Sequence, residues 1–134
     1  MPLAKANLGF PRIVSAGTTV SISTVTASAG VARTQYIRSI VVYNSTVGTA
    51  NTDLTQQVQI YMVPGSGGVV GVASAGDRIA RISLASNDTF FFEPQYPITL
   101  GNTGDSIQVF NEGTFNLGAA TNPVNVVVLG DREA

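Results

Sequence analysis

The residues of this chain that could do chemistry are few, and most of them are carboxylates. The 134-residue sequence contains no histidine and no cysteine, which excludes a Ser-His-Asp triad, a thiolate nucleophile and metal sites that use either ligand. Asp88 and Glu93 flank a run of phenylalanines, and two carboxylates held about 5 to 10 Å apart could hydrolyse a glycosidic bond. Their positions are better explained by solvation of a sheet edge, so we expect no enzyme.

Three other carboxylates, Asp53, Asp77 and Asp105, each stand in a turn rich in glycine or asparagine. An aspartate in such a turn accepts hydrogen bonds from nearby backbone N–H groups, and the spacing of a calcium loop does not occur. Residues 65–68 (GSGG) are not followed by the Gly-Lys-Ser/Thr of a phosphate-binding loop and predict a hairpin turn. We therefore expect no metal and no cofactor.

The charge of the chain is low. Charged residues make up 11% of the sequence and the formal net charge is −1, whereas about 25% is usual in soluble proteins. Partners such as nucleic acid or an anionic membrane bind clustered Lys and Arg, and we expect neither. Six of the seven basic residues are arginines, which suit interfaces better than lysine does. We take Arg38 and Arg81 as interface candidates.

The elements that must position these residues are β-strands, because short segments rich in Val, Ile, Thr, Tyr and Phe alternate with turn-forming clusters. In 36–44, apolar residues occupy both odd and even positions, so both faces of this strand must be covered, and we expect it to be central. About eight strands with no helix between them predict an all-β fold, an antiparallel β-sandwich or jelly roll. The segments that read as strands are 18–26, 36–44, 57–64, 78–84, 89–93, 97–100, 106–110 and 124–129, with a further short strand at 69–73.

We expect a single sandwich domain over residues 17–134, preceded by an N-terminal arm over residues 1–16. The arm is too apolar for a disordered tail and too irregular for a strand, so it lies either along another subunit or against its own sandwich. No leader segment is expected, and no stretch reaches the ~18 apolar residues of a membrane span. The apolar interface candidates are Leu3, Leu8 and Phe10 in the arm and Ile79, Phe91, Val127 and Leu129 on outward strand faces.

Four stretches carry a resemblance to a known group: residues 36–44 (YIRSIVVYN), 60–64 (IYMVP), 97–107 (PITL leading to GDSI) and 125–131 (NVVVLGD). Their order and character resemble small virion proteins of tailed bacteriophages over about residues 33 to 131. The resemblance implies a structural protein of the virion, assembled in the host cytoplasm. The major capsid protein or other virion proteins would be its partners, and it would form a homo-oligomer, with a trimer among the options.

Three functions compete. The first is a capsid decoration or cement protein that binds the outer shell and bridges neighbouring subunits. The second is a tail, baseplate or fibre-adaptor subunit, which the same resemblance allows. The third is a carbohydrate-binding jelly roll with Tyr61 or Phe91 as a stacking platform.

Overall fold

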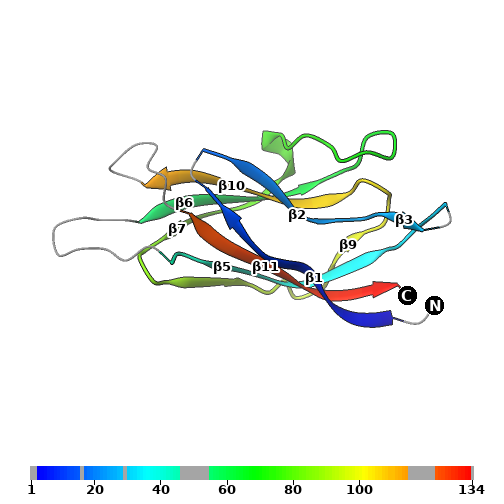
Figure 1. The fold of residues 1–134 in the computed structure, drawn as a ribbon, viewed down its shortest axis with the longest axis horizontal. Helices are drawn as coiled ribbons and strands as arrows, with labels where there is room; N and C mark the ends of the chain where they lie inside the picture. The colour runs from blue at the N-terminus through cyan, green and yellow to red at the C-terminus, as the bar shows by residue number, and fades with distance from the viewer. Residues whose placement is uncertain (1–2, 16, 29, 46–54, 115–122, 134) are drawn as a thin grey trace.

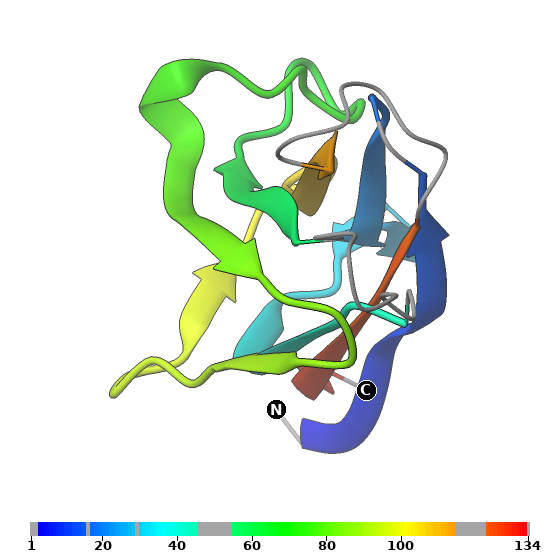
Figure 2. The ribbon, with the colours of Figure 1, turned by 90° about the vertical axis from the view of Figure 1, so that its left-hand side faces the viewer.

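The computed structural model describes residues 3–15, 17–28, 30–45, 55–114 and 123–133, and of residues 3–11, 28 and 114 it describes the backbone only. Two antiparallel sheets face each other across an apolar core, and the layers are visible in Figures 1 and 2. The solvent-accessible surface is 7023 Å², close to the roughly 6,700 Å² expected of a folded monomer of this mass. The all-β prediction is confirmed.

The strands of the described residues follow one another along the chain with a single 3-10 turn, η1 (Ala75–Asp77), among them. They are β1 (Leu3–Val14), β2 (Thr19–Thr24), β3 (Ala27–Ser28), β4 (Val31–Ala32), β5 (Gln35–Tyr43), β6 (Gln56–Val63), β7 (Arg78–Leu84), β8 (Thr89–Phe92), β9 (Ile98–Leu100), β10 (Ser106–Thr114) and β11 (Val124–Glu133).

Eight of these strands make the sandwich. The first sheet has the order β1-β11-β5-β8 and the second the order β2-β10-β6-β7. If the eight are counted along the chain, the orders are 1-8-3-6 and 2-7-4-5, which is the arrangement of a jelly roll. Strand β9 pairs with β5 beyond the end of β8, so β8 and β9 share one edge of the first sheet. Strands β3 and β4 form a separate ribbon.

The N-terminal arm is a strand, and the expectation that it is too irregular to be one is wrong. Strand β1 pairs antiparallel with β11 from Leu3 opposite Glu133 to Val14 opposite Val124. The register shifts twice, between Asn7 and Gly9 and between Gly9 and Arg12. Extra residues at such shifts break the period-2 alternation of side chains, which made the segment look irregular. Of the two placements left open, the structure has the arm paired with its own sandwich.

The core lies between the two sheets and is built from alternating strand residues. Strand β5 is central, as predicted, with β11 on one side and β8 and β9 on the other. Val124, Val126 and Val128 of β11 are at most 1% exposed. The rings of Phe90 and Phe92 pack against this core with centroids 6.5 Å apart.

One local prediction is wrong, and one strand end is more exposed than its alternation indicates. Residues 69–73 do not form a strand: Ser66 and Val69 make an isolated bridge around the 65–68 turn, and the chain then crosses over the second sheet instead of pairing with it. Met62 lies opposite the buried Ile107, on the inward side of β6, but it is 40% exposed where it lines a pocket, and Val63 on the other side of the strand is buried near Gly71. The register between β6 and β7 shifts just before this point, between Ile60 and Tyr61.

A cluster of buried amides closes one end of the sandwich. Asn44, Gln56 and Asn111 are each 0% exposed. Asn111 Nδ2 donates to Gln56 Oε1 at 2.8 Å, and Gln56 Nε2 donates to Asn44 Oδ1 at 3.2 Å. Their side-chain nitrogens also donate to the carbonyl oxygens of Val14, Leu84 and Pro123. The cluster therefore joins both sheets at the bases of the β1–β2, β5–β6, β7–β8 and β10–β11 connections.

Candidate interaction surface

The outer face of the second sheet carries many polar side chains that hydrogen-bond to one another or to the chain that crosses it. Ser83 donates to Gln57 at 3.0 Å, and Arg78 donates to Gln59 at 3.2 Å. The chain after β6 crosses this face, where Gln108 Nε2 donates to the carbonyl oxygen of Gly71 at 2.9 Å. Gln57, Gln59 and Gln108 are all at most 9% exposed as a result. Much of this face is thus occupied by the protein's own polar contacts.

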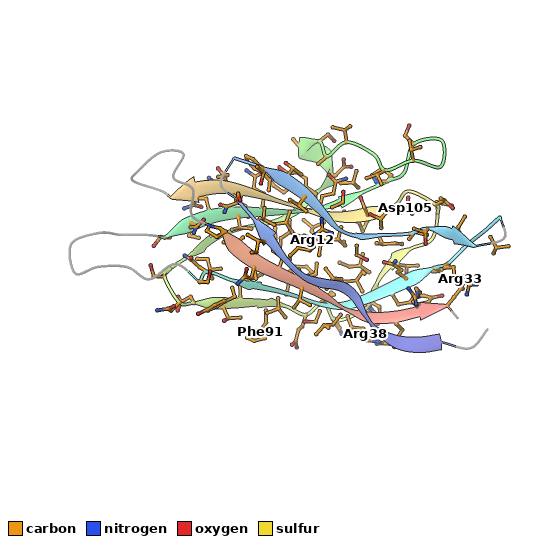
Figure 3. The ribbon with its side chains drawn as sticks, viewed as in Figure 1. Arg12, Arg33, Arg38, Phe91 and Asp105 are labelled. Atoms are coloured by element: carbon orange, nitrogen blue, oxygen red, sulfur yellow. The ribbon has the colours of Figure 1, made fainter. Side chains whose placement is uncertain are left out.

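The outer face of the first sheet is different in character, because apolar side chains follow one another across its strands. Val127 of β11 lies opposite Val41 of β5, and Val41 lies opposite Phe91 of β8. Residues directly opposite in a sheet point to the same side, so these three form a row. Phe91 is 62% exposed, and it projects from the lower margin of the molecule in Figure 3.

Two further residues extend this row along β11 and β1. Leu129 is 40% exposed, and Ile13, which lies opposite Asn125, is 65% exposed. We call the five residues Ile13, Val41, Phe91, Val127 and Leu129 the apolar face. The sequence predicted Phe91, Val127 and Leu129 as outward-facing, and the structure confirms this and brings them onto one sheet. Val41 was missed, although its position in the predicted strand at 36–44 could have identified it, and Ile13 was missed together with β1, whose register shifts hide the alternation.

Arg38 borders the apolar face and is held by an ion pair. Its Nε lies 2.5 Å from Asp131 Oδ2, and the Arg38 side chain stays 57% exposed while that of Asp131 is 7% exposed. The register between β11 and β5 shifts between Leu129 and Gly130, next to this pair. The ion pair holds the Nε end of the Arg38 guanidinium in place, while more than half of the side chain remains exposed to solvent. Such an arginine suits the rim of an interface.

Arg81 lies on the other sheet and is engaged by Glu112. Its Nε and Nη2 donate to the two carboxylate oxygens of Glu112 at 2.9 and 3.1 Å, a bidentate pair. These hydrogen bonds hold the pKa of Glu112 below its ordinary value and raise the pKa of Arg81. The two arginines predicted as interface candidates therefore do not belong to one surface.

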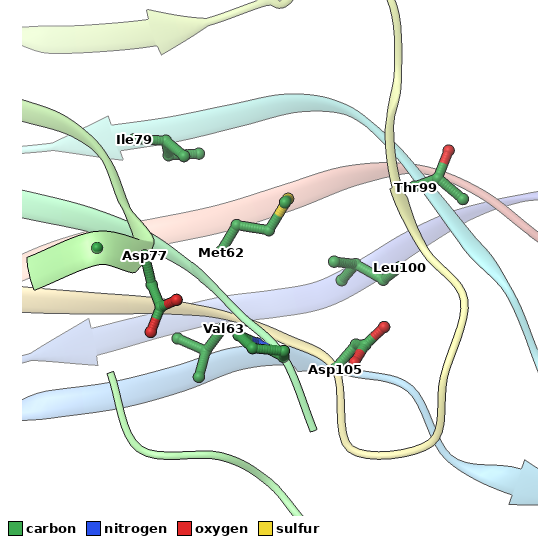
Figure 4. Close-up of a pocket in the computed structure, with 9 residues that line it drawn as sticks. Met62, Val63, Asp77, Ile79, Thr99, Leu100 and Asp105 are labelled. Atoms are coloured by element: carbon green, nitrogen blue, oxygen red, sulfur yellow. The ribbon is translucent and has the colours of Figure 1, made fainter. Parts of the chain in front are cut away.

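Ile79 stands apart from the apolar face, in a pocket of about 310 Å³ beside η1 (Figure 4). It is 36% exposed, and its neighbours in the pocket include Met62 and Leu100. Leu3, Leu8 and Phe10 belong to β1, but their side chains lie outside the described residues. The predicted interface residues thus fall into separate groups.

The carboxylates of two turns act as predicted. Asp105 Oδ2 accepts from the N–H groups of Gly101 and Asn102 at 3.2 and 2.9 Å, and its Oδ1 accepts from that of Gly65 at 2.8 Å. Asp77 Oδ2 accepts from the backbone and hydroxyl of Ser74.

Other predicted features bring no site together. Asp53 lies outside the described residues. Asp88 directly precedes β8 and Glu93 directly follows it, and both residues are exposed. In the part of the chain that the structure describes, no group of three or more His, Cys, Asp or Glu could hold a metal ion, and no helix is long and apolar enough to cross a membrane.

No protein-family model matches the chain, and no curated protein matches it either. The functional assignment therefore depends on the fold, on the apolar face and on the sequence resemblance.

Proposed function

We propose that this protein is a non-catalytic structural protein of a virion, a decoration or cement protein that binds the outer capsid shell through the apolar face. The observation that carries the proposal is the difference between the two outer faces. One is occupied by the chain's own hydrogen bonds, while the other presents Val127, Val41 and Phe91 in a row. Contiguous exposed apolar groups mark contact sites between proteins.

The fold supports the same proposal by analogy. Jelly rolls are common in viral capsid proteins, and also in lectins, so the fold alone does not choose a function. Tyr61, one of the two aromatic residues considered as a sugar platform, is half-buried and its hydroxyl bonds to Gln59. Phe91, the other, stands in a row with two valines. Aliphatic neighbours favour a protein contact over a sugar, which needs polar groups beside the ring.

A cement protein of this kind would act by mass action. A protein that binds only the assembled shell stabilises it by the free energy of binding. A standard interface removes about 800 Å² from each partner, roughly a ninth of the 7023 Å² surface of this chain. One sheet face is enough for such an interface, and repetition over many equivalent shell sites adds the small contributions together.

Copy number in purified particles tests the proposal. A shell-wide cement is present in hundreds of copies, and quantitative gel analysis of virions would give a band comparable to that of the major capsid protein. A handful of copies per particle would overturn the cement proposal and favour a tail, baseplate or fibre-adaptor subunit. Complete absence from purified particles would overturn the virion assignment altogether.

A further inference from the structure

The pocket beside η1 lies between edge strands of the two sheets. Its apolar walls are Met62 and Val63 at the end of β6, Ile79 of β7 and Leu100 of β9. Strands β7 and β9 are edge strands on this side of the sandwich, whereas on the opposite side the edge strands β1 and β2 contact each other. Apolar side chains therefore reach the surface here, and Met62 and Ile79 are 40% and 36% exposed.

Two carboxylates line the same pocket, and Figure 4 shows both among its apolar side chains. Asp77 ends η1, and Asp105 directly precedes β10. The hydrogen bonds that they accept come from backbone N–H groups and one hydroxyl, which are all neutral. The two ion pairs of the described residues lie elsewhere, on Asp131 and Glu112. Within the described residues, both pocket carboxylates therefore keep their negative charge without a counter-ion.

The part of the chain that the structure describes supplies no cation to this pocket. None of the described residues that line it is basic. Arg78 directly follows Asp77, but its Nη1 donates to Gln59 on the outer face of the second sheet at 3.2 Å. The one lysine of the sequence, Lys5, belongs to β1, which is the far edge of the first sheet from β9. A hollow with charges of one sign and apolar walls attracts the opposite charge, so the pocket is complementary to a cation from outside the chain.

Apolar walls beside a carboxylate suit a cation at the end of an aliphatic stem. Lysine and arginine side chains both lay such a stem on apolar surface and keep the charged end at polar groups. Arginine binds best to two oxygens of one carboxylate. Asp77 Oδ2 already accepts two hydrogen bonds from Ser74, and both oxygens of Asp105 accept from backbone N–H groups. No described residue donates to Asp77 Oδ1, and such a single acceptor suits the compact ammonium group of lysine.

The size and openness of the pocket favour a side chain that a protein presents. Its volume of about 310 Å³ is at the lower end of the range for small ligands, about 300 to 1,000 Å³. Small-molecule sites bury about 70 to 90% of their ligand, and walls that stay partly exposed themselves, as Met62 and Ile79 do, enclose less than that. A side chain on a protein surface brings its own cover.

We propose that the pocket beside η1 receives a lysine side chain of a partner protein. The aliphatic stem lies along Met62, Ile79 and Leu100, and the ammonium group donates to Asp77 Oδ1. The charge of Asp105 adds to the attraction through space. Because the charges stay near solvent, binding weakens as the salt concentration rises. The site is separate from the apolar face and does not rest on the proposed virion function.

Titration of the ¹⁵N-labelled chain with capped tripeptides, followed by NMR, tests this proposal. The probe is Gly-Lys-Gly, and the same peptide with norleucine or arginine in the central position is the comparison. We expect the lysine peptide to shift the amide signals of Gly76, Asp77 and Ile79 in a saturable, salt-sensitive way. Norleucine has the stem without the charge, and arginine has the charge without the compact head, so each should bind about threefold more weakly or worse.

Two variants separate the role of the Asp77 charge from a general loss of negative charge. Asp77→Asn keeps an oxygen that can accept from Ser74 and removes the charge, and it should weaken the lysine peptide about threefold or more. Asp88→Asn is the matched control, because Asp88 is an exposed aspartate outside the pocket, and it should bind as the wild type does. Unchanged signals from the rest of the chain show that each variant is folded.

Four results would overturn the proposal. They are a lysine peptide that causes no saturable shift at the pocket, a norleucine peptide that binds equally well, an arginine peptide that binds more tightly, and an Asp77→Asn chain with unchanged affinity. Pocket signals that move on simple dilution of the wild type would identify a second copy of the chain as the occupant, and would also overturn it. None of these results bears on capsid binding, which the apolar face would still provide.

Discussion

Asn111 and Gln56 meet side chain to side chain in the interior of the sandwich, where Asn111 Nδ2 donates to Gln56 Oε1 at 2.8 Å and both residues are 0% exposed. The same Asn111 nitrogen also donates to the carbonyl oxygen of Val14, and Asn111 Oδ1 accepts from the N–H group of Gly113. Asn111 thus connects the second sheet to β1 of the first. Stability of this end of the jelly roll depends on a polar cluster as well as on the apolar core.

Replacing Asn111 by alanine is expected to lower the free energy of unfolding by at least about 2 kcal/mol. The change removes at least three hydrogen bonds and leaves buried partners unsatisfied, and each such group costs about 1 to 3 kcal/mol. Urea unfolding gives the measurement. The exposed Asn102→Ala is the control and should change stability by less than about 0.5 kcal/mol. Equal effects of the two changes would mean that the amide cluster adds no stability.

Alanine at Gly104 is expected to cost far more stability than alanine at Gly67. Both glycines have positive φ, +94° and +60°, so each variant incurs the backbone cost of about 1 to 2 kcal/mol for a side chain in that region. A Cβ at Gly67 meets nothing within 4 Å, whereas one at Gly104 would lie 2.2 Å from the carbonyl oxygen of Val69. Thermal unfolding of the two variants should separate them clearly. Similar melting temperatures would contradict the close packing of the 65–71 loop against this turn.

The Arg81–Glu112 pair is expected to make a small part of the stability depend on pH. The hydrogen bonds from Arg81 lower the pKa of Glu112 in the folded state. The unfolded chain therefore takes up a proton at this carboxylate at a higher pH than the folded chain does. The stabilisation is complete above the unfolded pKa of about 4.3 and is lost as the pH falls through the lower folded pKa.

Glu112→Gln removes this contribution, and because the side chain of Arg81 is about half exposed to solvent, the loss at neutral pH is expected to be about 0 to 1 kcal/mol. Chemical unfolding of wild type and Glu112→Gln at neutral and acidic pH measures it. The difference between the two proteins should shrink towards acidic pH. A difference that grows there instead would mean that the carboxylate is not stabilised by Arg81.

The strands were largely predictable because their side chains alternate. Residues 78–84 were predicted as a strand, and β7 has those bounds, with Arg81 and Ser83 more exposed than Ala80, Ile82 and Leu84 as expected. Ile79 lies at the register shift between β6 and β7 and lines the pocket with Met62 and Leu100. β1 was missed because its register shifts hide the period of two. The predicted strand at 69–73 failed because the valines there serve a loop that glycines hold against a turn, and a pattern of apolar residues does not distinguish the two.

The candidate surface was predictable only in part. Phe91 and Val127 could be placed on outward faces from their own strands, but their position in one row depends on the pairing of β11, β5 and β8, which comes from distant parts of the chain. The buried cluster of Asn44, Gln56 and Asn111 carried no visible signal, because amides near strand ends look like ordinary loop residues. Only the fold shows that they meet.

Binding of Phe91→Asp to particles that lack the protein tests the central claim most directly. The variant would be mixed with such particles alongside wild type and Val31→Asp, a control at a 58% exposed valine on the separate β3–β4 ribbon, and bound copies per purified particle would be counted. Phe91 is the most exposed residue of the row Val127, Val41 and Phe91, and an aspartate there would leave a carboxylate unpaired in the interface, so we predict at least a tenfold loss of occupancy at subsaturating concentration, with Val31→Asp bound as well as wild type. Occupancy of Phe91→Asp equal to that of wild type would contradict the assignment of the apolar face as the capsid-binding surface.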